Sequence, residues 1–140
     1  MEESHSGLNI CSVPPALIDV IWERIRPHIH KAIDQAHGDL SEDNLRDRLR
    51  TGQEIALTIC DGPEIVTTCI VSVSVLDSGR KVLYVPSLGG ERMSEWLEDG
   101  LALLRSMAQQ YGCDGIRACG RPGWARTLPG AKAIHQIVEF

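Results

Sequence analysis

Residues 54–86 contain three apolar stretches separated only by short polar turns, and this arrangement constrains the fold more than any other feature. The stretches span Glu54 to Cys60, Ile65 to Leu76 and Lys81 to about Pro86. Their connectors, 61–64 and 77–80, are rich in Gly, Asp and Ser, which favour tight turns. Strands joined by such short connections pair antiparallel, so the sequence predicts a three-stranded meander.

The clearest helical pattern follows the meander. It begins at Ser94, and apolar residues recur every three or four positions as far as Tyr111, before Gly112 ends it. A strand is predicted next, over Asp114 to Cys119. A strand, a helix and a strand in this order indicate two parallel strands with the helix packed on one face of the sheet.

Two helices are predicted before the meander. Pro14 and Pro15 suit the first turn of a helix, and isoleucines then recur at helical spacing. These are Ile18, Ile21, Ile25, Ile29 and Ile33. Pro27 removes one backbone hydrogen bond from this helix, so a kink or break is expected near Arg26. Ser41 predicts the start of a second, shorter helix.

Length and composition favour a single α/β domain with helices on both faces of a mixed sheet. The 140 residues, 43% of them hydrophobic, suffice for one core and are too few to expect two. Residues 1–13 are predicted to be a polar tail, residues 14–140 the domain, and Ala133 to Phe140 its last strand. We expect no signal peptide and no membrane span, because no apolar run is long enough.

The cysteines and histidines predict neither a disulfide framework nor a metal site. Five cysteines are an odd number and include no C-x-x-C pair, so we expect reduced residues, mostly in the core of a protein from a cytosol-like compartment. His28 and His30 would point to different faces of a helix, which places them poorly for a shared metal ion.

The net charge of −5 argues against a general nucleic-acid binder. The last part of the chain is locally cationic, however, through Arg117, Arg121, Arg126 and Lys132. A nucleic-acid contact there remains a minor alternative, because no recognised reading motif accompanies these residues.

The order of the predicted elements resembles the GCN5-related N-acetyltransferase (GNAT) fold from about Pro14 onward. Sequence support is concentrated in VLYVPSLGGERMSEWLEDGLALLRSMAQQYGCDGIRACGRPGW, residues 82–124. The resemblance implies that acetyl-coenzyme A would insert its pantetheine arm between splayed fourth and fifth strands. Its pyrophosphate would lie at the following helix N-terminus, where backbone N–H groups attract anions. The implied cofactor residues are Gly89, Gly90, Arg92 and Ser94.

The sequence departs from this family's phosphate-loop pattern, which is Arg or Gln, two variable residues, Gly, one variable residue, then Gly or Ala. Whether Gly89 or Gly90 is taken as the glycine, two positions fail. Glu91 would also oppose an incoming anion. A simple turn into the helix, capped by Ser94, is the favoured alternative.

Acid and base groups are scarce in the expected places. The family commonly supplies a tyrosine acid after the fifth strand, and this chain has none there. Cys119 is the nearest replacement, although a buried structural cysteine is the alternative interpretation. Glu54 and Glu64 are candidate bases, and glutamates beside turns are usually only solvated.

Three further features resemble small GNAT-like proteins of tailed bacteriophages, some of which are internal virion or virion-assembly proteins. They are Trp22 with Pro27, the stretch LGGERMSEWL, and the stretch GRPGWARTLPG. The resemblance implies a non-catalytic contact protein without a cofactor, located in the virion or the host cytoplasm. Its implied partners are other virion proteins or further copies of itself. The alternative is an acetyl-coenzyme A-dependent N-acetyltransferase acting on a protein or small-molecule amine.

Tryptophans beside arginines indicate where a protein partner would bind. Trp124 lies between Arg121 and Arg126, a composition typical of contact hot spots. Packing of Trp124 in the core is an equally favoured alternative. Trp96 neighbours the apolar stripe of its helix, so its ring is a further contact candidate, with packing in the core as the more frequent alternative.

Overall fold

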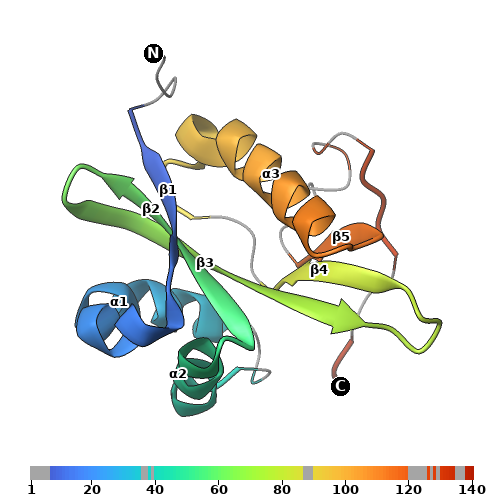
Figure 1. Ribbon diagram of the computed structural model, residues 1–140, viewed down its shortest axis with the longest axis horizontal. Helices are drawn as coiled ribbons and strands as arrows, with labels where there is room; N and C mark the ends of the chain where they lie inside the picture. Colours follow the sequence, from blue (N-terminus) through green and yellow to red (C-terminus); the bar gives the residue numbers. More distant parts are fainter. Residues whose placement is uncertain are drawn as a thin grey trace.

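A five-stranded mixed sheet lies between two layers of helix (Figure 1). The computed structural model describes residues 7–35, 38, 40–86, 90–119, 126, 128, 130–134 and 138–140. The strands are β1 (Asn9–Val13), β2 (Glu54–Asp61), β3 (Glu64–Val75), β4 (Lys81–Val85) and β5 (Gly115–Ala118), in that order across the sheet. The helices are the 3-10 turn η1 (Pro15–Leu17), α1 (Ile18–Gln35), α2 (Glu42–Thr51) and α3 (Met93–Gln110).

The predicted sheet topology is confirmed. β2 pairs with β3, and β3 with β4, in antiparallel register. β5 returns beside β4 and pairs with it in parallel after the α3 crossover. The short turns allow only antiparallel pairing between consecutive strands. The α3 crossover is long enough to return the chain to the side of the sheet where β4 begins, so β5 can run parallel to β4.

Alternation along the strands divides the apolar side chains between two cores. Leu57 and Leu83 point to the α3 face, where Trp96 and Leu104 cover them. Ala56 and Ile70 point to the opposite face, where they meet α1 and α2. In Figure 1, α3 lies above the sheet and α1 and α2 lie below it, so helices cover both faces as predicted.

The two N-terminal helices form where the sequence predicts them. Ser41 caps α2, because its Oγ accepts a hydrogen bond from the Asn44 N–H at 3.4 Å, and Gly52 ends the helix at φ 83°. The break expected near Arg26 was wrong, since α1 continues through Pro27. Ile25 and Ile29, on either side of Pro27, are completely buried, and their packing stabilises the helix against the loss of one hydrogen bond.

Two predictions at the chain ends differ from the structure. β1 lies within residues 1–13, the predicted polar tail, and pairs antiparallel with β2. Its side chains are mostly exposed. The strand therefore forms through backbone hydrogen bonds, and no apolar pattern in the sequence predicts it. The predicted last strand is not found in residues 133, 134 and 138–140, which lie outside any strand. The rest of that stretch, 135–137, falls outside the described residues.

Candidate functional site

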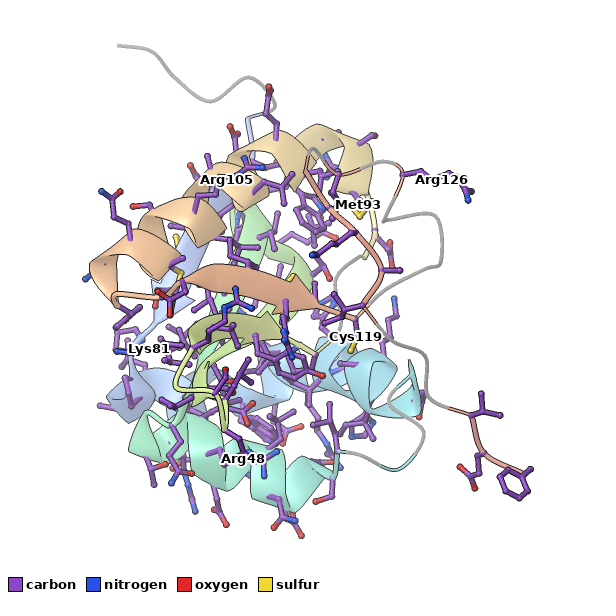
Figure 2. All side chains as sticks on the ribbon, turned by 90° about the vertical axis from the view of Figure 1, so that its right-hand side faces the viewer. Arg48, Lys81, Met93, Arg105, Cys119 and Arg126 are labelled. Atoms are coloured by element: carbon purple, nitrogen blue, oxygen red, sulfur yellow. The ribbon has the colours of Figure 1, made fainter. Side chains whose placement is uncertain are left out.

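The carboxyl ends of β4 and β5 bring Tyr84 and Cys119 together. Tyr84 lies opposite Arg117 in the parallel register, and Cys119 follows two residues later, so all three side chains share one face. The Tyr84 hydroxyl lies 3.1 Å from the Cys119 sulfur. Figure 2 shows Cys119 at the end of β5. Ligands of open α/β sheets commonly bind at such strand ends.

This pair corrects two expectations about the chemistry. Cys119 is exposed, so the interpretation as a buried structural cysteine was wrong. No tyrosine follows β5, but Tyr84 on the neighbouring strand presents its hydroxyl at the same place. Tyr84 could have been identified from the sequence, because parallel pairing of the two predicted strands places it beside the residues near Cys119.

β4 and β5 remain paired along their whole described length. Val85 is still in register with Ala118, and the N–H of Cys119 donates to the Val85 carbonyl at 3.0 Å. The splayed strands that the family resemblance implies are therefore not found between residues 82–85 and 115–119. Any opening for a pantetheine arm lies beyond these residues.

Arg92 at the N-terminus of α3 is already engaged by two carboxylates. Its guanidinium donates to Asp61 at 2.9 Å and to both oxygens of Glu95 at 2.7 and 2.8 Å. Hydrogen bonds from Arg92 to Glu95, and then to Asp61, raise the pKa of Arg92 further above its ordinary value. The same contact lowers the pKa of Glu95. The side chain joins α3 to the end of β2, and its compensated charge is a weak attraction for a pyrophosphate.

Glu91 adds a second ion pair at the same end of α3. Its carboxylate accepts from the Lys31 ammonium of α1 at 2.8 Å, and this hydrogen bond lowers the pKa of Glu91. Its carbonyl accepts from the indole N–H of Trp96 at 2.9 Å. Together with Asp61 and Glu95, Glu91 makes the start of α3 acidic, which opposes the anion site that the resemblance implies.

Of the other residues implied in cofactor binding, the structure describes Gly90 and Ser94. Gly90 has φ 140°, and a Cβ there would lie 2.5 Å from Thr67 Oγ1 on β3, so only glycine fits against this strand. Ser94 does not cap α3 as predicted, because Arg92 occupies the cap position in a left-handed conformation. Gly89 lies outside the described residues.

Trp96 was wrongly predicted as a partner contact. Only 2% of its surface is exposed, because Gly100 one turn later leaves room for the ring, which lies 3.2 Å from where a Cβ of Gly100 would be. Arg126 is exposed and points away from the body of the protein in Figure 2. Arg121 and Trp124 lie outside the described residues, so the proposed hot spot stays a prediction.

The cysteines lie less deeply in the core than the sequence predicts. All five cysteines are free, but only Cys69 is buried, and Cys11 is exposed like Cys119. The described part of the chain contains no cluster of His, Cys, Asp and Glu able to hold a metal ion. Nor does any described helix combine the length and apolar character that crossing a membrane requires.

A small apolar cavity lies under α3, away from the Tyr84 hydroxyl. Its lining includes Trp96, Leu101, Cys69 and Val85, and it is almost entirely apolar. The cavity offers no polar groups for a nucleotide or a diphosphate, so it is not the cofactor site.

Comparison with known proteins identifies the fold. No protein-family model and no curated protein sequence matches the chain. Among solved structures, an acetyltransferase of Trypanosoma brucei superposes with a TM-score of 0.64 at 13% identity, covering 95% of this chain and 98% of that one. The fold is GNAT-like.

Two further structures agree. An aminoglycoside acetyltransferase from an uncultured soil sample, in complex with trehalose, has a TM-score of 0.66 at 11% identity and covers 99% of this chain and 97% of that one. A ribosomal-protein-alanine N-acetyltransferase of Brucella melitensis has a TM-score of 0.63 at 12% identity, covering 95% and 96%. Nothing in these comparisons links the GNAT-like chain to bacteriophage proteins.

Proposed function

We propose that the chain is an acetyl-coenzyme A-dependent N-acetyltransferase acting on an amine of a protein or small molecule. The observation that carries the proposal is the Tyr84 hydroxyl beside an exposed Cys119 thiol at the carboxyl ends of β4 and β5. The fold shared with solved acetyltransferases supports the same reaction class, although fold alone does not decide chemistry.

The residues present suit the reacting end of acetyl-coenzyme A better than its diphosphate end. When bound, this molecule would supply an activated acetyl thioester. The Tyr84 hydroxyl can donate its proton to a leaving thiolate. Arg117 is in register with Tyr84 on the same face, and we expect its positive charge to stabilise the negative charge that develops in the reaction.

The diphosphate end would depend on backbone groups. Because Arg92 is paired with Asp61 and Glu95, the N–H groups in the first turn of α3 are the remaining attraction for phosphate oxygens. The acidic residues around that turn lower the expected affinity, so we expect weaker binding than a well-formed phosphate loop provides.

A contact protein without catalytic activity is the second candidate. The engaged Arg92 and the unbroken pairing of β4 with β5 favour it, because both would hinder the binding of a cofactor. The finer hypothesis, a virion or virion-assembly component with phage proteins as partners, rests on the sequence resemblance alone.

Calorimetry and a transfer assay separate the two candidates. Acetyl-coenzyme A is titrated into the full chain, and release of free thiol is then followed with a panel of primary amines. The acetyltransferase proposal expects saturable binding and thiol release that depends on the amine. Folded protein that neither binds nor turns over acetyl-coenzyme A would favour the contact protein.

A further inference from the structure

Four side chains form one row across the sheet on the face that carries the Tyr84 hydroxyl. Glu54 of β2 is in register with Ser72 of β3, Ser72 with Tyr84 of β4, and Tyr84 with Arg117 of β5. Residues in register point to the same face of a sheet. The row is therefore polar from end to end and continues the candidate site toward β2.

α1 and α2 cover this face only in part. Their principal strand contacts are with β2 and β3, whereas α3 packs against β4 and β5 on the opposite face. In Figure 1, α1 and α2 lie under the β1 to β3 part of the sheet, and β4 and β5 extend beyond them. The row thus runs from the edge of α2 to the Tyr84 hydroxyl, and none of the helices that the structure describes packs across its β4 and β5 end.

Glu54 has unused hydrogen-bonding capacity at the α2 end of the row. Its side chain is only 13% exposed, and its Oε2 accepts from the Arg48 Nε of α2 at 2.5 Å. Its Oε1 is buried and has no hydrogen-bond partner among the residues that the structure describes. A buried carboxylate oxygen without a donor is costly, so a ligand donor that reaches it gains more than it would at an exposed site.

We propose that Glu54 is a specificity-determining residue that binds a second amino group of the acceptor. The inference rests on the proposed acetyltransferase function, because it places the reacting amine at Tyr84. Two strand spacings separate Glu54 from Tyr84 in the row, which is about 10 Å. The preferred acceptor is therefore a diamine whose second, protonated nitrogen lies about that far from the reacting nitrogen.

Arg48 controls access to this oxygen. It is the more exposed partner of the pair, at 32% against 13% for Glu54, so its side chain is the one that shifts when a donor approaches. The carboxylate would then lie between two cations and share its two oxygens between them. Removing the charge of Arg48 should strengthen the attraction for the amine.

The test compares diaminooctane with diaminopropane and with octylamine, which has the same chain but one amine. We expect the wild-type KM for diaminooctane to be roughly tenfold below that for the other two, the value of one charge-assisted hydrogen bond. Glu54→Gln should raise the diaminooctane KM by a similar factor and leave kcat and the octylamine KM unchanged. Glu98→Gln, which changes an exposed glutamate of α3 on the opposite face of the sheet, is the matched control and should change nothing.

A second variant keeps the proposal testable if Glu54→Gln does not fold. Arg48→Gln should lower the diaminooctane KM, because it leaves the Glu54 carboxylate without its cation. An unchanged or raised value in this variant, or equal KM values for diaminooctane and octylamine in the wild type, overturns the inference and leaves the acetyltransferase proposal standing.

The amine site at Glu54 can also be tested if the acetyltransferase proposal fails. If no amine is acetylated, calorimetry of diaminooctane with the chain alone still reports on Glu54. Binding that Glu54→Gln removes and Glu98→Gln retains would support the amine site while the acetyltransferase proposal fails. No binding would overturn both.

Discussion

The hydroxyl of Tyr84 lies 3.1 Å from the sulfur of Cys119, although 35 positions separate the two residues in the chain. The contact exists because α3 returns the chain so that β5 pairs in parallel with β4. It places a hydroxyl and an exposed thiol together at the ends of these two strands.

Tyr84→Phe should abolish most of the transfer activity. The variant lacks the hydroxyl that we propose as proton donor to the leaving thiolate, and we expect kcat to fall about 100-fold. The affinity for acetyl-coenzyme A, measured by calorimetry, should change little. Tyr111→Phe, at the far end of α3, is the control and should retain full activity. Equal kcat values for Tyr84→Phe and the wild type would remove Tyr84 from the mechanism.

Thiol labelling should single out Cys119. In the folded protein, Cys119 and Cys11 should react quickly with an alkylating reagent, and Cys69 slowly, because only Cys69 is buried. Acetyl-coenzyme A should protect Cys119 and not Cys11, which lies on β1 at the opposite edge of the sheet. Mass spectrometry of the labelled peptides measures each site. Equal protection of both cysteines would contradict a cofactor site at Tyr84.

Gly90→Ala should destabilise the protein more than Gly62→Ala. Both glycines have positive φ, but an added Cβ meets Thr67 only at Gly90 and meets nothing within 4 Å at Gly62. We expect a loss of about 1–2 kcal/mol of unfolding free energy for Gly62→Ala from backbone strain alone. Gly90→Ala should lose clearly more. Urea denaturation measures both, and equal losses would show that the Gly90 contact with β3 is absent in solution.

Trp96→Ala should cost about 3–5 kcal/mol of unfolding free energy, as expected for a buried tryptophan. The ring is 2% exposed, and its N–H donates to the Glu91 carbonyl. Tyr111→Ala, at a side chain that is 38% exposed, should cost under about 1 kcal/mol. Denaturant unfolding followed by circular dichroism compares the two variants. A small loss for Trp96→Ala would restore the surface position that the sequence predicts.

Stability should fall in acid because several glutamates have lowered pKa values in the folded state. A hydrogen bond with His30 chiefly lowers the pKa of Glu42 below its ordinary value of 4.5. A carboxyl with a lowered folded pKa stabilises the protein above its unfolded pKa and loses that contribution as pH falls through the folded pKa. The melting temperature should therefore fall as pH drops below about 4.5.

Glu42→Gln isolates this contribution. It should lower the melting temperature at pH 7, where the wild-type carboxylate is ionised and paired with His30 and Arg26. The difference from the wild type should shrink as pH falls through the folded pKa of Glu42, where that carboxyl becomes protonated. A difference that stays constant across this range would contradict a role for the charge of Glu42.

Much of the fold could be predicted because its signals lie within a few residues of one another. The turn at 61–64 forces β2 and β3 into an antiparallel pair, and Ser41 caps the helix that immediately follows it. The chain ends were harder to predict. β1 depends on backbone pairing with β2, and no local apolar pattern reports the presence of such a partner.

The candidate site was less predictable for the same reason. The sequence identified Cys119 and Arg92 but missed Tyr84, and it did not show that Arg92 is paired with Asp61, 31 positions away. It also placed Trp96 at the surface, because a position beside an apolar stripe does not reveal whether Gly100 leaves space for the ring.

The sequence by itself determined which segments become strands and helices in the body of the domain, and the antiparallel and parallel order in which they pair. Periodicity, turn length and capping act over a few residues, so they can be read along the chain. Only the tertiary structure decided that Tyr84 meets Cys119, that Arg92 is neutralised, and that one oxygen of Glu54 is buried with no donor among the described residues. These properties depend on register and packing between distant segments, which bring together groups that no local pattern connects.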